Sequence, residues 1–95
     1  MKAKKIFCVV AYDIENDRQR TKIAKLLEKF GTRINYSVFE CLFTEKQLEN
    51  TQVKIEKQVQ SKKDSVVFYR ICVECYTKTI HLPQRKRIVQ KVEIV

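Results

Sequence analysis

Two segments of the chain, residues 6–12 and 65–73, are apolar on both sides of an extended strand. The first reads Ile-Phe-Cys-Val-Val-Ala-Tyr without polar alternation, and Arg70 is the one charged side chain of the second. Strands of this kind are covered by protein on both faces. Because one layer of helices covers only one face of a sheet, something else must cover the other. This demand limits the architectures open to the chain.

The segment that follows the first strand predicts a helix. Its apolar side chains recur at helical spacing and form one stripe, at Ile23, Leu26, Leu27 and Phe30. We expect the helix over 17–30, with Asn16 or Asp17 as its N-terminal cap. Gly31 stands where a helix end favours a residue that tolerates positive φ.

The rest of the chain predicts a second helix and further strands. Thr44 and Gln47 have the spacing of a capping box, which predicts a helix from there to residue 61. The remaining apolar stretches predict strands over 34–43, 65–73, 77–82 and 88–95.

This order predicts a single domain over residues 1–95, of the α+β class. It suits a ferredoxin-like sandwich, in which right-handed crossovers place both helices on one face of the sheet. The other face would be a large exposed apolar surface. We therefore expect a homodimer whose sheets stack about 10 Å apart. The last strand, 88–95, would pack across the sheet edge of the partner protomer.

The charge of the chain points to a polyanionic partner. Lys and Arg number 20 against 11 acidic residues, which gives a formal charge of +9. Nucleic acid is the first candidate, and a protein that is merely basic is the alternative. The basic start and the apolar run at 6–12 superficially resemble a signal peptide, but that run is short and no cleavage site follows. No run reaches the roughly 20 apolar residues of a membrane span, so we expect a cytoplasmic protein.

Asp13 is the acid that ends the first strand, immediately before a helix. Such an acid either shapes the turn or joins a ligand site at the end of the sheet. In a two-fold dimer two copies of Asp13, with waters and a substrate phosphate, would hold Mg²⁺ or Mn²⁺. The chain has no P-loop, dinucleotide fingerprint, HExxH or nucleophile elbow. An enzyme of this sequence would therefore hydrolyse phosphodiesters with carboxylates and metal.

Basic side chains gather in two places along the chain. The helix at 17–30 carries Arg18, Arg20, Lys22, Lys25 and Lys29, which form a solvated helix face or a phosphate-binding one. Arg33 and Ser37 flank the start of the next strand and would reach the same cleft. The second cluster guards an edge strand or clamps a nucleic-acid backbone, and consists of Arg85, Lys86 and Arg87.

His81 and the four cysteines have less specific roles. We interpret His81 as a surface or edge residue rather than a catalytic base. The cysteines are most simply thiols of the core and of strand ends, at Cys8, Cys41, Cys72 and Cys75. The spacing of the last two leaves half of a zinc site or a redox pair open as alternatives.

Four stretches of the chain closely resemble the CRISPR-associated protein two family. They are a strand ending in Tyr12-Asp13, a basic helix, a glycine with the strand after it, and a third strand, at 10–14, 20–27, 31–41 and 64–72. The resemblance covers most of the chain, from about residue 6 to 75. Beyond Cys75 it is one of length and β-character only.

The resemblance implies a ferredoxin-like homodimer whose C-terminal strand is exchanged onto its neighbour. It implies a place in CRISPR adaptation, where the protein bridges two dimers of the integrase and holds the spacer duplex by its backbone. Members of the family are also described as Mg²⁺-dependent endonucleases that act on single-stranded RNA or on double-stranded DNA.

Family positions transfer to this chain residue by residue. The metal aspartate falls on Asp13 and the tyrosine before it on Tyr12, while the second-strand positions fall on Arg33, Ser37 and Phe39. Of a common arginine pair in the first helix only Arg20 matches, since Gln19 stands at the other place. Asp13, Tyr12 and Ser37 are thus the candidate catalytic residues, with Asp13 as metal ligand. The candidate nucleic-acid contacts are Arg18, Arg20, Lys22, Arg33, Arg85, Lys86 and Arg87.

Two functions follow, and they are compatible. One is a metal-dependent nuclease built on Asp13, and the other is a non-catalytic scaffold whose basic faces bind duplex DNA within an integrase complex. A third hypothesis, a ligand-sensing module of the same fold, is disfavoured by the missing glycine-rich loop and by the +9 charge.

Overall fold

The computed structural model describes residues 4–60 and 62–83. In chain order its elements are β1 (Lys5–Asp13), α1 (Asp17–Glu28), β2 (Gly31–Asn35), β3 (Val38–Thr44), α2 (Glu45–Glu56), β4 (Ser65–Ile71) and α3 (Val73–Thr77). The four strands form one antiparallel sheet in the order β2-β3-β1-β4. This order with α1 and α2 as crossovers is the ferredoxin-like arrangement, so the predicted α+β class is confirmed.

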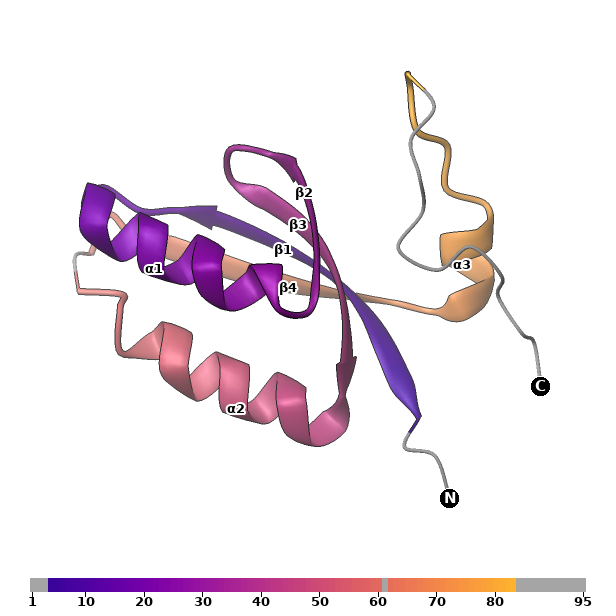
Figure 1. Ribbon diagram of the computed structural model, residues 1–95, viewed down its shortest axis with the longest axis horizontal. Coiled ribbons are helices and arrows are strands. Elements are labelled where there is room, and N and C mark those ends of the chain that lie inside the picture. Colours follow the sequence, from indigo (N-terminus) through magenta and orange to yellow (C-terminus); the bar gives the residue numbers. More distant parts are fainter. Residues whose placement is uncertain (1–3, 61, 84–95) are drawn as a thin grey trace.

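Both long helices lie across the same face of the sheet (Figure 1). The central strands supply the floor of the core, where Cys8 pairs with Cys41 and Val10 with Phe39. Phe39, Cys41 and Phe43 alternate along β3 and are fully buried. The helices close the core with one buried stripe each, formed by Ile23, Ala24 and Leu27 on α1 and by Leu48, Ile55 and the polar Thr51 on α2.

The single strand predicted over 34–43 is wrong, because these residues form the hairpin of β2 and β3. The chain turns at Tyr36 and Ser37, where the Ser37 N–H donates to Oδ1 of Asn35 over 3.0 Å. An asparagine that accepts a backbone N–H two residues later replaces the glycine that usually marks such a turn. The apolar alternation continues almost without a break from β2 into β3, so the sequence did not indicate the turn between them.

The C-terminal part of the described chain also departs from expectation. The second helix ends at Glu56 rather than at 61. No strand occupies 77–82, because α3 covers 73–77 and the described residues after it are irregular. The Thr77 hydroxyl donates to the carbonyl of Glu74 over 2.6 Å, and the Thr79 hydroxyl donates to the carbonyl of Cys75 over 3.3 Å. Threonines, which are typical of strands, thus supply hydrogen bonds to backbone carbonyls of α3 here. The strand predicted over 88–95 lies outside the described residues.

Gly31 has a different purpose from the predicted helix cap. The C-cap of α1 is Lys29, in the right-handed region, and Gly31 has no positive φ. A Cβ atom on Gly31 would lie 2.7 Å from the Cα of Cys41 and closer still to the carbonyl oxygen of Glu40. Glycine is therefore required by the close approach of β2 to β3.

Among the residues that the structure describes, the second face of the sheet is covered at one end. There α3 places the Tyr76 ring on Phe7, with ring centroids 3.8 Å apart, and α3 lies far from α1 and α2 (Figure 1). Farther along this face Val67 and Tyr69 of β4 are 41% and 55% exposed. The face of the sheet opposite α1 and α2 is thus apolar and is not covered by those helices. This agrees with the prediction from the apolar segments 6–12 and 65–73.

Candidate active site and nucleic-acid interface

Asp13 ends β1 on the face of the sheet that the long helices leave open. Side chains alternate along β1, and Cys8, Val10 and Tyr12 point into the core. Asp13 therefore points to the opposite face, beside its cross-strand partner Ser65, and it is exposed. Within residues 4–60 and 62–83 no cation forms an ion pair with it. The carboxylate is free to bind a ligand that approaches this face.

The loop after Asp13 is held by Asp64, the residue immediately before β4. Its Oδ1 accepts the N–H of Glu15 over 3.0 Å, and its Oδ2 accepts the N–H of Gln60 over 3.3 Å. Asn16 then caps α1 by accepting the N–H of Gln19 over 3.0 Å. Asp64 thereby ties the loop behind the candidate metal ligand to the start of β4. The sequence gives one weak signal for this role, an acid immediately before a strand.

Tyr12 contacts the β2–β3 turn on the helix side of the sheet. Its N–H donates to the carbonyl of Ser37 over 2.9 Å, and its hydroxyl donates to the carbonyl of Tyr36 over 3.0 Å. Burial raises the pKa of the Tyr12 phenol, against the opposing charges of Arg33 and Arg20. The structure therefore brings Tyr12 and Ser37 together, while it places Asp13 on the other face of the sheet.

A basic pocket of about 370 Å³ opens on the helix side, between α1 and the β2–β3 hairpin. Arg20, Lys25 and Arg33 supply its positive charge, and its remaining lining is Tyr12, Thr21, Ala24, Glu28 and Tyr36. Tyr36 is 87% exposed, so its ring is available for stacking on a base. Sequence reasoning did not select Tyr36 because the turn that projects it was not predicted.

The two arginines of this pocket are held in place. Arg20 donates from Nη1 to the carbonyl of Ile14 over 3.0 Å and forms an ion pair with Asp17. The Arg33 guanidinium lies 5.4 Å from the centroid of the Phe39 ring. Arg18 and Lys22 are exposed on α1 outside this pocket. Arg85, Lys86 and Arg87 lie outside the described residues.

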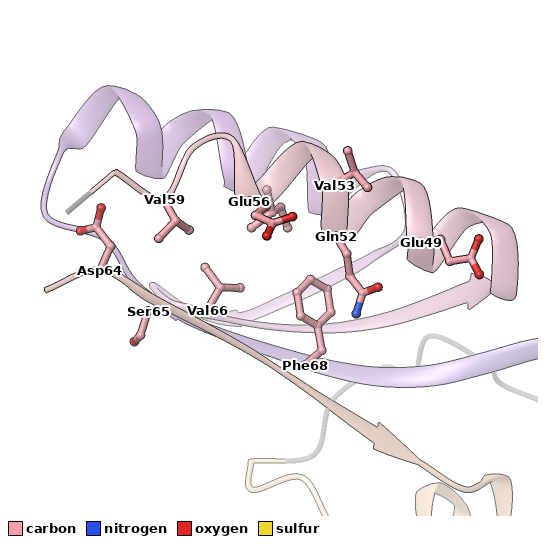
Figure 2. A pocket seen from close by; sticks show the side chains of 10 residues that line it. Glu49, Gln52, Val53, Glu56, Val59, Asp64, Ser65, Val66 and Phe68 are labelled. Atoms are coloured by element: carbon pink, nitrogen blue, oxygen red, sulfur yellow. The ribbon is translucent and has the colours of Figure 1, made fainter. Parts of the chain in front are cut away.

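A larger groove, of about 680 Å³, separates α2 from β4. Figure 2 shows Val59, Val66 and Phe68 facing its interior, with Glu49 and Glu56 on the helix above. Asp64 adds a further acid at one end. Because this rim is acidic, the groove would repel a phosphate backbone and is not the nucleic-acid interface.

Nε2 of His81 lies 3.0 Å from Oε2 of Glu40, within hydrogen-bond distance. Both side chains are largely buried, at 10% and 14% exposed, on the face that α3 partly covers. The site is remote from the basic pocket and does not adjoin Asp13 along β1, since Glu40 pairs with Val9. The expectation of a surface or edge position for His81 is wrong, because its side chain is largely buried against β3, an interior strand of the sheet.

Comparison with known proteins decides the family. The model of "CRISPR associated protein Cas2" matches residues 6–79. The chain belongs to the Cas2 family. Among its relatives, the "CRISPR-associated endoribonuclease Cas2 3" of Synechocystis is 48% identical over 64% of this chain and 66% of that protein. The "CRISPR-associated endoribonuclease Cas2" of Thermus thermophilus is 37% identical over 80% of this chain and 81% of that one.

Solved structures agree with the fold of this Cas2 chain. Streptococcus pyogenes Cas2 superposes with a TM-score of 0.70 at 24% identity, over 79% of this chain and 95% of that one. A chain of a "Partial Cas6-RT-Cas1--Cas2 complex" superposes with a TM-score of 0.63 at 28% identity, over 82% and 91% of the two chains. None of the helices within the described ranges is long and apolar enough to cross a membrane.

Proposed function

We propose that this Cas2 chain is a homodimeric, nucleic-acid-binding subunit of a CRISPR adaptation complex. The observation that carries the proposal is the position of Asp13 on the uncovered face of the sheet. A second copy that covers this face would bring two such carboxylates near one symmetry axis. A solved structure similar to this chain contains Cas1 together with Cas2, which supports an integrase as the further partner.

The dimer would bury the apolar face that the helices leave open. Val67 and Tyr69 are its most exposed large side chains, and Val9 and Ala11 of β1 lie beside them. Strand β4 stands at an edge of the described sheet, where the C-terminal strand of a partner protomer would add to it.

The dimer is tested by placing a charge on this face. Val67→Asp should convert the protein to monomers, because a buried unpaired carboxylate is costly. Val53→Asp is the matched control, since Val53 is also an exposed valine, 53% accessible, but lies on α2. Sedimentation velocity measures the mass. A wild-type protein that is monomeric at micromolar concentration would contradict the proposed dimer.

The basic pocket would hold the phosphate backbone of duplex DNA or single-stranded RNA. Arg20 and Arg33 offer planar guanidinium groups, and Lys25 adds a third charge beside them. Binding of this kind weakens steeply with salt and shows no preference for sequence.

Arg33→Gln tests the pocket through the salt dependence of duplex binding. If Arg33 contacts one phosphate, its loss lowers the slope of log K against log salt by about 0.9. Lys54→Gln, on the exposed surface of α2, removes the same charge elsewhere and serves as the control. Equal slopes for the two variants would remove Arg33 from the interface.

A divalent cation fits this arrangement only as a ligand shared between protomers. Within residues 4–60 and 62–83 no three ligand side chains gather at one point, and Asp13 is a single accessible carboxylate. Mg²⁺ commonly takes one or two carboxylates together with waters and substrate phosphate. Bound by Asp13 of both protomers, Mg²⁺ or Mn²⁺ would supply Lewis-acid stabilisation of a phosphoryl oxygen.

The chain's own groups would hold the backbone on both sides of Asp13 in place. Asp64 fixes the loop behind Asp13, so the carboxylate is held at a defined end of β1. Burial raises the pKa of the Tyr12 phenol, and the hydroxyl serves to hold the β2–β3 turn. Ser37 contributes its carbonyl to the same contact.

Asp13→Asn tests hydrolysis while preserving size. We expect RNA and duplex-DNA cleavage in the presence of Mg²⁺ to fall about 100-fold or more, with nucleic-acid affinity retained. Glu49→Gln, an exposed acid on α2, is the control. Cleavage equal to wild type would exclude Asp13 from the chemistry.

The second candidate function is a non-catalytic scaffold that holds DNA for an integrase. It is favoured by the presence of one accessible carboxylate at the site of each chain, with the basic pocket on the opposite face of the sheet. Spacer acquisition that survives Asp13→Asn but is lost on reversing the charges of Arg20 and Arg33 would support this function.

A further inference from the structure

Cys72 and Cys75 form a dithiol that the proposed function does not use. Cys72 follows the last residue of β4 directly and is the N-cap residue of α3. Cys75 comes three residues later, on the first turn of that helix. The Cys75 N–H donates to Sγ of Cys72 over 3.2 Å. Both cysteines are exposed. The spacing and this contact place two accessible thiols on one turn of the chain.

The other two cysteines provide an internal contrast. Cys8 and Cys41 are buried in the core, opposite one another on β1 and β3. Burial raises the pKa of the Cys8 thiol, and it raises the pKa of Cys41 to about 12. The thiolate is the reactive form of cysteine. Cys8 and Cys41 are therefore protected from thiol reagents both because they are buried and because they stay protonated.

The exposed pair is differentiated in the way that a reactive dithiol requires. Hydrogen bonds from the Cys75 thiol and from the Cys75 backbone lower the pKa of Cys72. The same thiol contact raises the pKa of Cys75. The Cys75 N–H points at Sγ of Cys72, and a backbone donor in this position stabilises a thiolate there, so we take Cys72 as the attacking sulfur and Cys75 as the sulfur that resolves a mixed disulfide.

The turn that carries the pair also controls the cover over one end of the sheet. Immediately after Cys75, the buried Tyr76 stacks on Phe7 of β1. The Tyr76 N–H donates to the carbonyl of Cys72 over 3.0 Å, so the first turn sets the position of that ring. Farther along, the contact of His81 Nε2 with the Glu40 carboxylate fixes the segment after α3 to the same face.

We propose that Cys72 and Cys75 form a reversible disulfide that locks the first turn of α3 over Phe7, by exchange with a low-molecular-weight disulfide such as glutathione disulfide. The Cys72 thiolate attacks one sulfur of the oxidant and forms a mixed disulfide with it, while the other sulfur of the oxidant leaves as a thiolate. Cys75, after losing its proton to the departing thiolate, attacks Sγ of Cys72 and expels the second thiol. Two cysteines are oxidised and one disulfide is reduced to two thiols.

The experiment uses the whole protein in glutathione buffers of increasing oxidised fraction, followed by acid quenching, alkylation and tryptic mass spectrometry. Cleavage after Arg70 and Lys78 places both thiols in the peptide 71–78, while Cys8 and Cys41 fall in separate peptides. We expect that peptide to escape alkylation and to be two hydrogen atoms lighter than the unlabelled dithiol, while Cys8 and Cys41 are alkylated as free thiols. Amide exchange of Tyr76 and Lys78 should slow in the oxidised protein, because their N–H groups bond within this turn.

Single substitutions separate the roles of the two sulfurs. Cys75→Ser should trap Cys72 as a mixed disulfide with glutathione. Cys72→Ser should slow alkylation of the remaining exposed thiol about 10-fold or more relative to Cys72 in Cys75→Ser. Equal reactivity in the two variants would contradict the assigned order of attack.

Three results would overturn the proposal. The peptide 71–78 could remain a dithiol throughout the buffer series, or the oxidised product could be a disulfide between two chains. Zinc that copurifies at one ion per two chains, and that shields both thiols from glutathione disulfide, would assign the pair to a metal site instead. Each result is distinct from a failure of the nuclease or the scaffold, since none of them involves Asp13 or the basic pocket.

Discussion

Gly31→Ala tests the reason for the one glycine of the chain. The added Cβ would lie 2.7 Å from the Cα of Cys41, whereas carbon atoms pack at about 3.5 Å or more. Strands β2 and β3 must therefore separate locally by at least roughly 0.8 Å, since the Glu40 carbonyl oxygen lies closer still to the added Cβ. Overpacking of this kind costs about 1–3 kcal/mol, and weakening the adjacent hydrogen bond from the Leu42 N–H to the Phe30 carbonyl adds about 1.

We therefore expect the free energy of unfolding to fall by about 3 kcal/mol. A domain of this length has a total stability of about 5–14 kcal/mol, so the variant should fold but be clearly weakened. In urea the midpoint should fall by about 2 M for a slope near 1.5 kcal/mol/M. Because β2 carries Arg33, duplex affinity should fall as well.

Two further variants make this test decisive. Thr32→Ala changes an exposed side chain next in the strand and should stay within about 0.5 kcal/mol of wild type. Gly31→Asn distinguishes steric crowding from a need for positive φ, since asparagine tolerates that conformation but is larger than alanine. The steric reason requires Gly31→Asn to be less stable than Gly31→Ala. The reverse order, or a Gly31→Ala variant as stable as wild type, would refute it.

Two other predictions concern buried groups of the site and core. Tyr12→Phe removes the hydrogen bond to the Tyr36 carbonyl and should lower the free energy of unfolding, measured by urea titration, by about 1 kcal/mol. Tyr69→Phe is the control, because the Tyr69 ring is 55% exposed, and it should change this free energy little. Because the folded-state pKa of Cys41 is raised from its usual value of 9.0 to about 12, the unfolded chain loses this proton first, and stability should fall as pH rises between these values. The slope from this group is about 1.4 kcal/mol per pH unit. Denaturation of Cys41→Ala against the Thr32→Ala control should show the slope reduced only in the first, and equal slopes would contradict the assignment.

Local patterns predicted the elements whose residues depend mainly on their own neighbours. The stripe through Ile23 and Leu27 predicted α1, and the capping box of Thr44 and Gln47 predicted the start of α2. The unalternating strand at β1 predicted a sheet with an apolar second face. Asp13 was selected by its place at the end of that strand, which the structure confirms, while its role remains a prediction.

Contacts distant in the sequence decided what the patterns missed. The turn at Tyr36 and Ser37 depends on Tyr12, 24 residues earlier than Tyr36, which accounts for the error over 34–43. The helical state of 73–77 depends on the packing of Tyr76 against Phe7, against the β-like composition of that segment.

The sequence by itself determined the α+β class, the basic character and the identity of the accessible acid, because periodicity, charge and strand ends are written locally along the chain. Three features were decided only by the tertiary structure. Tyr12 and Asp13 lie on opposite faces of the sheet, and Arg20 and Arg33 line one pocket. Gly31 is needed because β2 approaches β3 closely, and not for its φ. The physical reason is that each of these depends on which strands become neighbours. Pairing between distant segments is set by the burial of the whole core, and no single stretch of the chain encodes it.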